Sequence, residues 1–204
     1  MAATRSTARS DGMAKAQKLS EKEKKFLLAL ARKSIKRYLE TGRKQDVKPS
    51  EVPTKRLTED GACFVSLHIG EELRGCIGSL EAHRPLVMDV VDNALACAFG
   101  DPRFFPLSEE ELPKVKISIS VLTKPECLPV KDSEDLLKKL VPGKHGLIME
   151  KGTARATFLP VVWEQIPDKK EFLEHLSLKA CLAKDGWKSV DCRFYVYEAE
   201  EFSE

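Results

Sequence analysis

The sequence lacks a long apolar run, a strong excess of charge and any cofactor fingerprint. Its 204 residues hold 34 Lys and Arg against 32 Asp and Glu, a formal net charge of +2. This balance gives no whole-chain attraction to nucleic acid, which we therefore do not expect as a partner. Without a secretory segment or roughly 18 consecutive apolar residues, the chain is expected to be cytoplasmic, with no membrane partner.

Cysteine is present, but not at metal-binding spacing. No Cys-x-x-Cys pair occurs and no His lies at zinc-finger spacing, so we expect no structural zinc and reduced thiols. The sequence also has no P-loop, dinucleotide fingerprint or zinc-protease helix, and it therefore predicts no cofactor. The six cysteines are Cys63, Cys76, Cys97, Cys127, Cys181 and Cys192.

The order of helical and strand patterns predicts an α+β fold. Hairpins and helices interleave without regular βαβ alternation, which favours a largely antiparallel sheet flanked by helices, with a smaller second lobe and a cleft between them. Residues 1–19 are interpreted as a disordered tail and residues 20–204 as the domain. Helices are predicted at 20–42, 86–99, after 108, at 133–141 and after 168, and strands at 63–69, 73–80, 115–122, 146–150, 154–162 and 192–197.

The hexapeptide at residues 73–78, Leu-Arg-Gly-Cys-Ile-Gly, combines a cation, a thiol and two glycines. Strand alternation places Arg74 and Cys76 on one face, while Leu73 and Ile77 enter the core. A guanidinium beside a thiol favours a lowered cysteine pKa. The hexapeptide therefore predicts a functional site.

Cys76 is the candidate nucleophile of this site, and His145 is its candidate base. Backbone N–H groups of Gly75 or Gly78 would then receive an oxyanion. Ser66 lies on the antiparallel strand, where alternation brings it beside Cys76. The alternatives for Cys76 are a ligand contact or a close-packing role, and for His145 a hydrogen bond that stabilises a turn.

Three charged residues complete the candidate site. Arg74 has a planar fork that suits a carboxylate or phosphate, or else it forms a salt bridge to an acidic residue across the sheet, such as Asp101 or Glu150. Asp101 and Arg103 flank a proline in a stiff loop that presents both charges to the cleft. Alternatively, Asp101 ties the backbone N–H groups of its own turn.

Several collinear blocks resemble the AMMECR family, named for the AMME syndrome chromosomal region gene. The chain departs from the family pattern at Val161, often Gln, and at Cys181, where the family has Gly. The matching blocks are residues 73–80, 98–104, 111–112, 117–122, 143–148, 156–160, 163–167, 172–173 and 179–180.

This resemblance implies a larger sheet lobe, a smaller lobe and a cleft near the Arg-Gly-Cys motif. It implies no established reaction, and the sequence does not decide whether the protein is an enzyme. Family members occur beside proteins resembling extradiol dioxygenases and radical-SAM enzymes, which suggests a shared pathway.

The leading hypothesis is a cleft that binds a small anionic or nucleotide-like ligand, with thiol-based group transfer as its chemistry. The alternative is a non-catalytic adaptor that binds a protein partner. An RNA-associated factor is less favoured, because the basic side chains at 33, 36, 37, 43 and 44 are interspersed with acidic ones on a helix face typical of solvent exposure.

Overall fold

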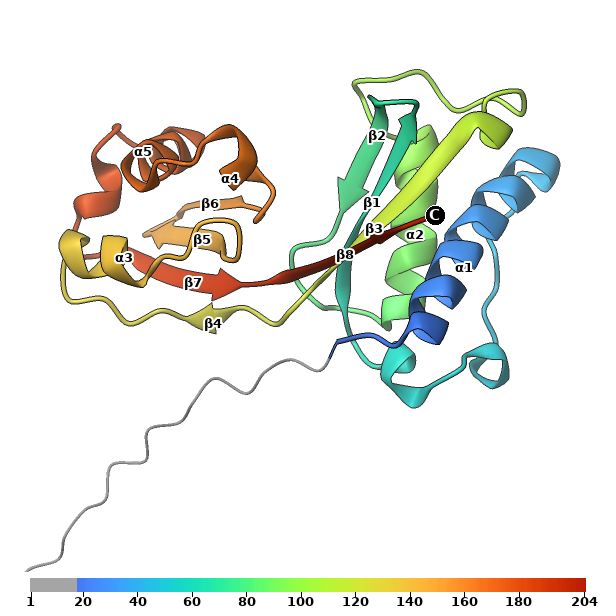
Figure 1. Cartoon of the computed structure of the whole chain (residues 1–204), viewed down its shortest axis with the longest axis horizontal. Coiled ribbons are helices and arrows are strands. Elements are labelled where there is room, and N and C mark those ends of the chain that lie inside the picture. Colours follow the sequence, from blue (N-terminus) through green and yellow to red (C-terminus); the bar gives the residue numbers. More distant parts are fainter. Residues whose placement is uncertain (1–17) are drawn as a thin grey trace, which may run out of the picture.

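The computed structural model describes residues 18–204, which form two four-stranded antiparallel sheets, each covered by helices (Figure 1). The α+β class is thus confirmed. Most of the predicted tail at 1–19 lies outside the described residues. Its last residue, Leu19, is buried, and the Leu19 N–H donates to the Glu200 carboxylate at 2.9 Å.

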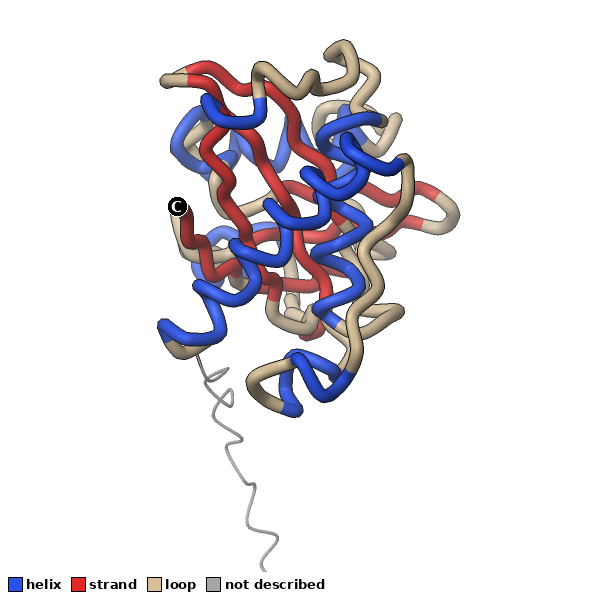
Figure 2. Tube along the Cα trace, turned by 90° about the vertical axis from the view of Figure 1, so that its right-hand side faces the viewer, coloured by secondary structure: helices blue, strands red, loops and turns tan. Residues whose placement is uncertain are grey.

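The large lobe holds the sheet of strand order β2-β1-β3-β8. Two helices, α1 and α2, lie side by side over one face of this sheet (Figure 2). A capping box between Ser20 and Glu23 starts α1, and Gly42 ends it with φ +66°. The elements are β1 Ala62–Ile69, β2 Glu72–Gly78, β3 Val115–Leu122, β8 Ala199–Ser203, α1 Glu21–Thr41 and α2 Leu86–Phe99.

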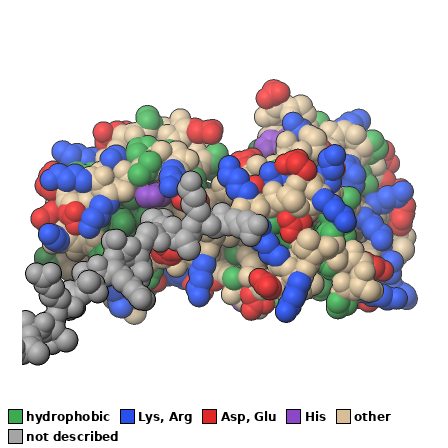
Figure 3. All heavy atoms as spheres, turned by 60° about the horizontal axis from the view of Figure 1, so that its bottom comes forward, with side chains coloured by type: hydrophobic (Ala, Val, Ile, Leu, Met, Phe, Trp, Pro, Cys, Tyr) green, Lys and Arg blue, Asp and Glu red, His purple; other side chains and the backbone are tan. Residues whose placement is uncertain are grey.

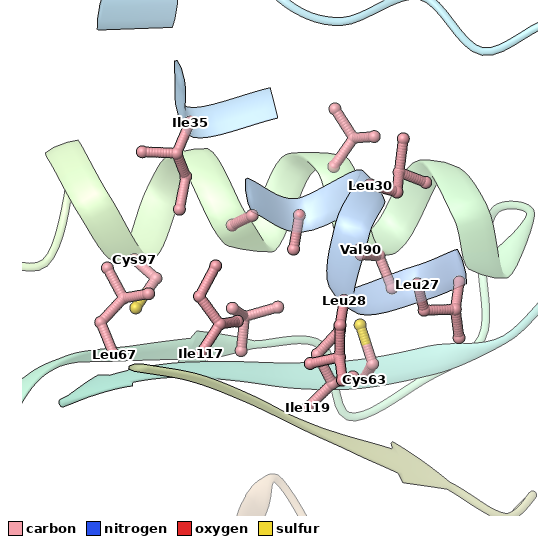
Figure 4. Close-up of a cluster of buried hydrophobic side chains, with 14 of the residues drawn as sticks. Leu27, Leu28, Leu30, Ile35, Cys63, Leu67, Val90, Cys97, Ile117 and Ile119 are labelled. Atoms are coloured by element: carbon pink, nitrogen blue, oxygen red, sulfur yellow. The ribbon is translucent and has the colours of Figure 1, made fainter. Parts of the chain in front are cut away.

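The core of this lobe follows from strand alternation. Cys63, Val65 and Leu67 point toward the helices, where each is fully buried. They meet apolar residues of both helices, among them Leu27 and Val90 (Figure 4). The opposite face of β1 therefore carries the polar positions.

The small lobe is inserted between β3 and β8. Its sheet has the order β4-β7-β5-β6, and the Trp163 ring stacks on Phe172 at 3.6 Å between ring centroids in its core. The elements are β4 Glu126–Cys127, β5 Gly146–Lys151, β6 Ala154–Phe158, β7 Arg193–Tyr197, α3 Ser133–Lys139, α4 Val162–Gln165 and α5 Lys169–Lys179. Short 3₁₀ turns lie at Pro49–Glu51, Lys55–Thr58, Leu112–Lys114 and Gly186–Lys188.

The chain crosses between the lobes twice, and the two crossings are bonded together. The Thr123 N–H donates to the Glu198 carbonyl, and the Glu198 N–H donates to Thr123 Oγ1, each at 2.9 Å. A separate apolar cluster that includes Leu122, Ile148 and Tyr197 packs at the junction. The two lobes are therefore joined by side-chain packing as well as by the chain.

Three sequence predictions differ from the structure. The strand predicted at 154–162 ends at Phe158, because Pro160 has no N–H for the ladder and the chain turns into α4. The helix predicted after 108 is only the 3₁₀ turn Leu112–Lys114, because Pro113 has no N–H with which to continue an α-helix. Strand β8 was not predicted.

Cys181 has a strained backbone that a substitution should relieve. It follows α5 with φ +59°, a region that disfavours any residue with a Cβ. We expect Cys181→Gly to raise the free energy of unfolding by about 1 kcal/mol, measured by urea denaturation. Cys181→Ala is the control because it keeps the Cβ, and an equal gain there would contradict the strain explanation.

Candidate functional site

A β-bulge takes Arg74 out of the predicted strand alternation. Leu67 pairs with Gly75 but His68 pairs with Leu73, so Arg74 has no partner on β1. Leu73 was expected in the core, but its side chain is 38% exposed, because the bulge reverses the facing of the strand beyond it. Arg74 and Cys76 therefore do not act as neighbours on one regular face.

Arg74 is held by a residue that sequence reasoning missed. Its Nε and Nη2 donate to the two Glu111 oxygens at 2.8 and 3.0 Å, and Nη2 also donates to the Phe105 carbonyl. Arg74 thus forms the salt bridge to an acidic residue that was its alternative role, but the partner is Glu111 and neither Asp101 nor Glu150. Arg74 Nη1 is buried and has no hydrogen-bond partner among the described residues. Arg74 is thus already paired within its own chain.

Asp101 and Arg103 grip the backbone of Cys76 at the outer edge of β2. The Cys76 N–H donates to Asp101 Oδ2 at 2.9 Å, and Arg103 Nη2 donates to the Cys76 carbonyl at 3.2 Å. Arg103 also bonds both Asp101 oxygens, at 3.0 and 2.7 Å. The pair offers an acceptor and a donor, as a neighbouring strand would, and so closes this sheet edge.

The same pair fixes the charge of the site. The Arg103 guanidinium holds the pKa of the Asp101 carboxyl well below its usual range, with the Cys76 N–H as a further cause. Both guanidiniums contact the Phe104 ring, with its centroid 5.8 Å from Arg74 Cζ and 5.4 Å from Arg103 Cζ. Each arginine is therefore paired with its own carboxylate, Arg74 with Glu111 and Arg103 with Asp101, and both contact the same aromatic ring.

The two motif glycines, Gly75 and Gly78, are packed so closely against the large lobe that neither position has room for a Cβ. A Cβ on Gly75 would lie 2.5 Å from the Cys97 carbonyl oxygen, and one on Gly78 would lie 2.2 Å from the Phe64 ring. The Cys97 thiol behind Gly75 is buried, and burial raises its pKa to about 12. Both glycines thus permit close packing within the lobe.

Cys76 lies on the face of the large sheet opposite to the face that α1 and α2 cover. Ser66 is opposite Cys76 in register, as alternation predicted, and its hydroxyl donates to Cys76 Sγ at 3.1 Å. Ser66 is opposite Ser118, which is opposite Ser203. A thiol and three hydroxyls therefore form one row across all four strands, which we call the hydroxyl row. Sequence reasoning missed Ser118 and Ser203, although the alternation of β3 already separated its serines from the core.

His145 is not brought to Cys76. It lies in the small lobe just before β5 and is buried, and its Nδ1 accepts the Val141 N–H at 3.3 Å. Burial lowers the pKa of its imidazole. No hydrogen bond joins the two side chains within the described residues. The His145 carbonyl accepts from Trp163 Nε1 at 2.7 Å, which ties this turn to α4.

A cavity of about 160 Å³ lies between the lobes, but none of the predicted site residues lines it. Within residues 18–204, no group of His, Cys, Asp and Glu is placed to hold a metal ion. No helix of that part is long and apolar enough to cross a membrane. Basic and acidic side chains intermingle over both lobes on the face drawn in Figure 3.

Fold and site together define a two-lobed α+β protein with a motif cysteine at a closed sheet edge. The AMMECR1 family model matches residues 28–202, so the chain belongs to the AMMECR1 family, as the motifs indicated.

Similar proteins span nearly the whole chain. Protein MK0488 of Methanopyrus kandleri is 43% identical over 196 residues, covering 92% of this chain and 91% of that protein. Protein MJ0810 of Methanocaldococcus jannaschii is 36% identical over 193 residues, covering 91% and 92%. The crystal structure of the uncharacterized protein PH0010 from Pyrococcus horikoshii matches with a TM-score of 0.81 and 35% identity, over 91% of this chain and 93% of that one.

Gly75→Ala tests the close packing behind the motif. The new Cβ would lie 2.5 Å from a backbone oxygen of α2, which cannot move away as a flexible side chain would. We expect a loss of about 2 kcal/mol or more in the free energy of unfolding, measured by urea denaturation. Glu72→Ala at an exposed position of β2 is the control, and a comparable loss there would sink this explanation.

Asp101→Asn tests the grip on Cys76 through its pH dependence. Since the folded-state pKa of Asp101 is depressed, its carboxylate contributes stability above the usual carboxyl pKa of about 4 and loses it as pH falls below that value. We expect the variant to lose about 2 kcal/mol at pH 7 and progressively less below pH 4, measured by urea denaturation.

The exposed carboxylate of Glu109 provides the matched control for this experiment. Glu109→Gln should change stability little at either pH. A pH-independent loss in Asp101→Asn would show that shape, and not charge, holds the edge.

Proposed function

We propose that the face of the large sheet that carries the hydroxyl row binds a small anionic ligand, with Cys76 as a ligand contact. The hydroxyl row carries this proposal. Ser118 is only 8% exposed, yet its hydroxyl makes no hydrogen bond with any described residue. The Ser118 Oγ does not belong to the fully buried polar atoms that lack a partner, so this hydroxyl reaches the surface and is available to a ligand.

The charges next to the hydroxyl row support an anion. His68 and Lys116 are paired in register and follow the row along β1 and β3. The Lys116 ammonium is exposed and forms no salt bridge within the described part of the chain. Arg103 adds a half-exposed guanidinium at the edge beside Cys76. Lys116 and Arg103 are thus two cations near the hydroxyl row, whereas the carboxylate of Glu201 lies on the other side of the row, where Glu201 pairs with Ser120.

Cys76 is assigned as a contact because a base is missing from its surroundings. A nucleophilic thiol requires a thiolate, favoured by a neighbouring imidazole or an unpaired cation. Among the described residues, only the Ser66 hydroxyl bonds Cys76 Sγ, and the Arg74 guanidinium faces Glu111 instead. If Cys76 carried out thiol-based group transfer, its assignment as a ligand contact would be wrong.

A protein partner is the second candidate, favoured by apolar side chains beside the motif. Phe105 is 89% exposed, and Leu73 is the half-exposed residue next to the bulge. Exposed aromatic residues next to an arginine are typical of interface hot spots. A partner of this kind would meet the edge of the sheet, whereas a small ligand would lie on its face.

Titration with inorganic phosphate and AMP, followed by backbone amide NMR, tests the anionic ligand. We expect AMP to shift amides of β1 and β3, and Ser118→Ala to weaken its binding about fivefold, because one hydrogen bond is lost. Ser34→Ala is the control, since Ser34 is a buried helical serine whose hydroxyl bonds Leu30. Shifts confined to other surfaces would overturn the proposal.

Alkylation rates separate a contact from a nucleophile. AMP should slow iodoacetamide labelling of Cys76 and leave the exposed Cys127 and Cys181 unchanged. Labelling of Cys76 below pH 8 should not outpace these two thiols. A much faster rate at Cys76 would replace the contact assignment with a nucleophile.

A further inference from the structure

We propose that the cavity between the lobes binds a primary ammonium group carried on an aliphatic stem, such as a lysine side chain or an alkyl diamine. This site goes beyond the proposed anion site, because it takes the opposite charge and includes no residue of the hydroxyl row. Figure 1 shows α4 and the loop before it on the side of the small lobe that faces the large sheet.

The cavity lining combines polar side chains with four apolar residues, which we call the apolar wall: Leu159, Pro160, Val161 and Ala199. Its volume of about 160 Å³ resembles that of a protein cavity that accommodates benzene, and so it suits a group of five or six heavy atoms. Val161 contributes to the apolar wall although its side chain is 48% exposed. The lining residues are Ser120, Gly143, Leu159, Pro160, Val161, Glu164, Ala199 and Glu201.

Its polar groups are acceptors without cations. Glu164 comes from α4 and Glu201 from β8, so the two carboxylates belong to different lobes. Neither forms a salt bridge in the described chain, and no Lys, Arg or His belongs to the lining. The nearby Lys144 ammonium is already engaged by Glu198 at 3.0 Å. A bound cation would therefore compensate two charges that the chain leaves unpaired.

The set of donors and acceptors selects the kind of cation. A primary ammonium has three N–H donors, and the cavity offers the carboxylates of Glu164 and Glu201 and the hydroxyl of Ser120. The lining has no aromatic residue, whereas quaternary ammonium groups are bound in aromatic cages. Two carboxylates and one hydroxyl also fall short of the six or more oxygens that calcium takes. The apolar wall then accommodates the aliphatic stem.

Titration of the full chain with n-butylammonium, followed by amide NMR, tests this inference. We expect saturable shifts at Gly143 and Ala199, with n-butanol and tetramethylammonium at least about tenfold weaker, since each lacks the charged donors. If n-butanol bound as tightly as n-butylammonium, the cavity would recognise only the aliphatic stem, and the inference of an ammonium site would be wrong. Equal binding of tetramethylammonium would contradict the donor argument.

Two isosteric variants assign the binding to the two carboxylates. Glu164→Gln and Glu201→Gln should each weaken n-butylammonium binding about tenfold while keeping side-chain volume. Both positions are exposed, so the fold should survive, and Glu109→Gln is the exposed control. Unchanged affinity in both variants would overturn the inference, whatever the result of the AMP titration on the other site.

Discussion

One stripe of α2 holds the hairpin that carries the motif. Asp89, Asn93 and Cys97 recur at every fourth residue, and Asp101 continues the spacing beyond the helix. The Cys63 N–H donates to Asp89 Oδ2 at 2.9 Å, and Asn93 Nδ2 donates to the Cys63 carbonyl at 3.0 Å. Asp101 binds the second strand in the same way. The hairpin is therefore fixed at the start of β1 and at the motif, and the register of the hydroxyl row depends on both contacts.

The features that could be predicted from the sequence are those set by neighbouring residues. The capping box at Ser20 determines where α1 begins, because both its hydrogen bonds lie within one turn. Alternation in β1 and β2 brought Ser66 and Cys76 together, since a hairpin with a short turn leaves little freedom of register. Asp101 and Arg103 were recognised because only a proline separates them.

The features that could not be predicted depend on contacts between distant segments. Strand β8 has few apolar residues, and its pairing with β3 completes the large sheet. Glu111 binds Arg74 across 37 positions of the chain, so no local pattern reports it. The bulge at Arg74 has no signal of its own, because the extra residue shows only against the partner strand. His145 attracts attention in the sequence as a candidate base, but in the fold its side chain and carbonyl stabilise a turn of the small lobe.

Arg74 is close to Cys76 in the sequence, but in the fold its guanidinium is paired with Glu111 and not with the Cys76 thiol. Arg74 faces Glu111 and Arg103 faces Asp101, so each guanidinium forms a close pair whose net field falls off rapidly with distance. Such pairs organise the edge of the sheet, because each guanidinium is engaged by a carboxylate of its own chain. For the proposed anion site, recognition would therefore depend on the small uncharged groups of the hydroxyl row and on the Lys116 ammonium next to it. In that proposal the face of the sheet, and not the charge of the motif, determines which ligand fits.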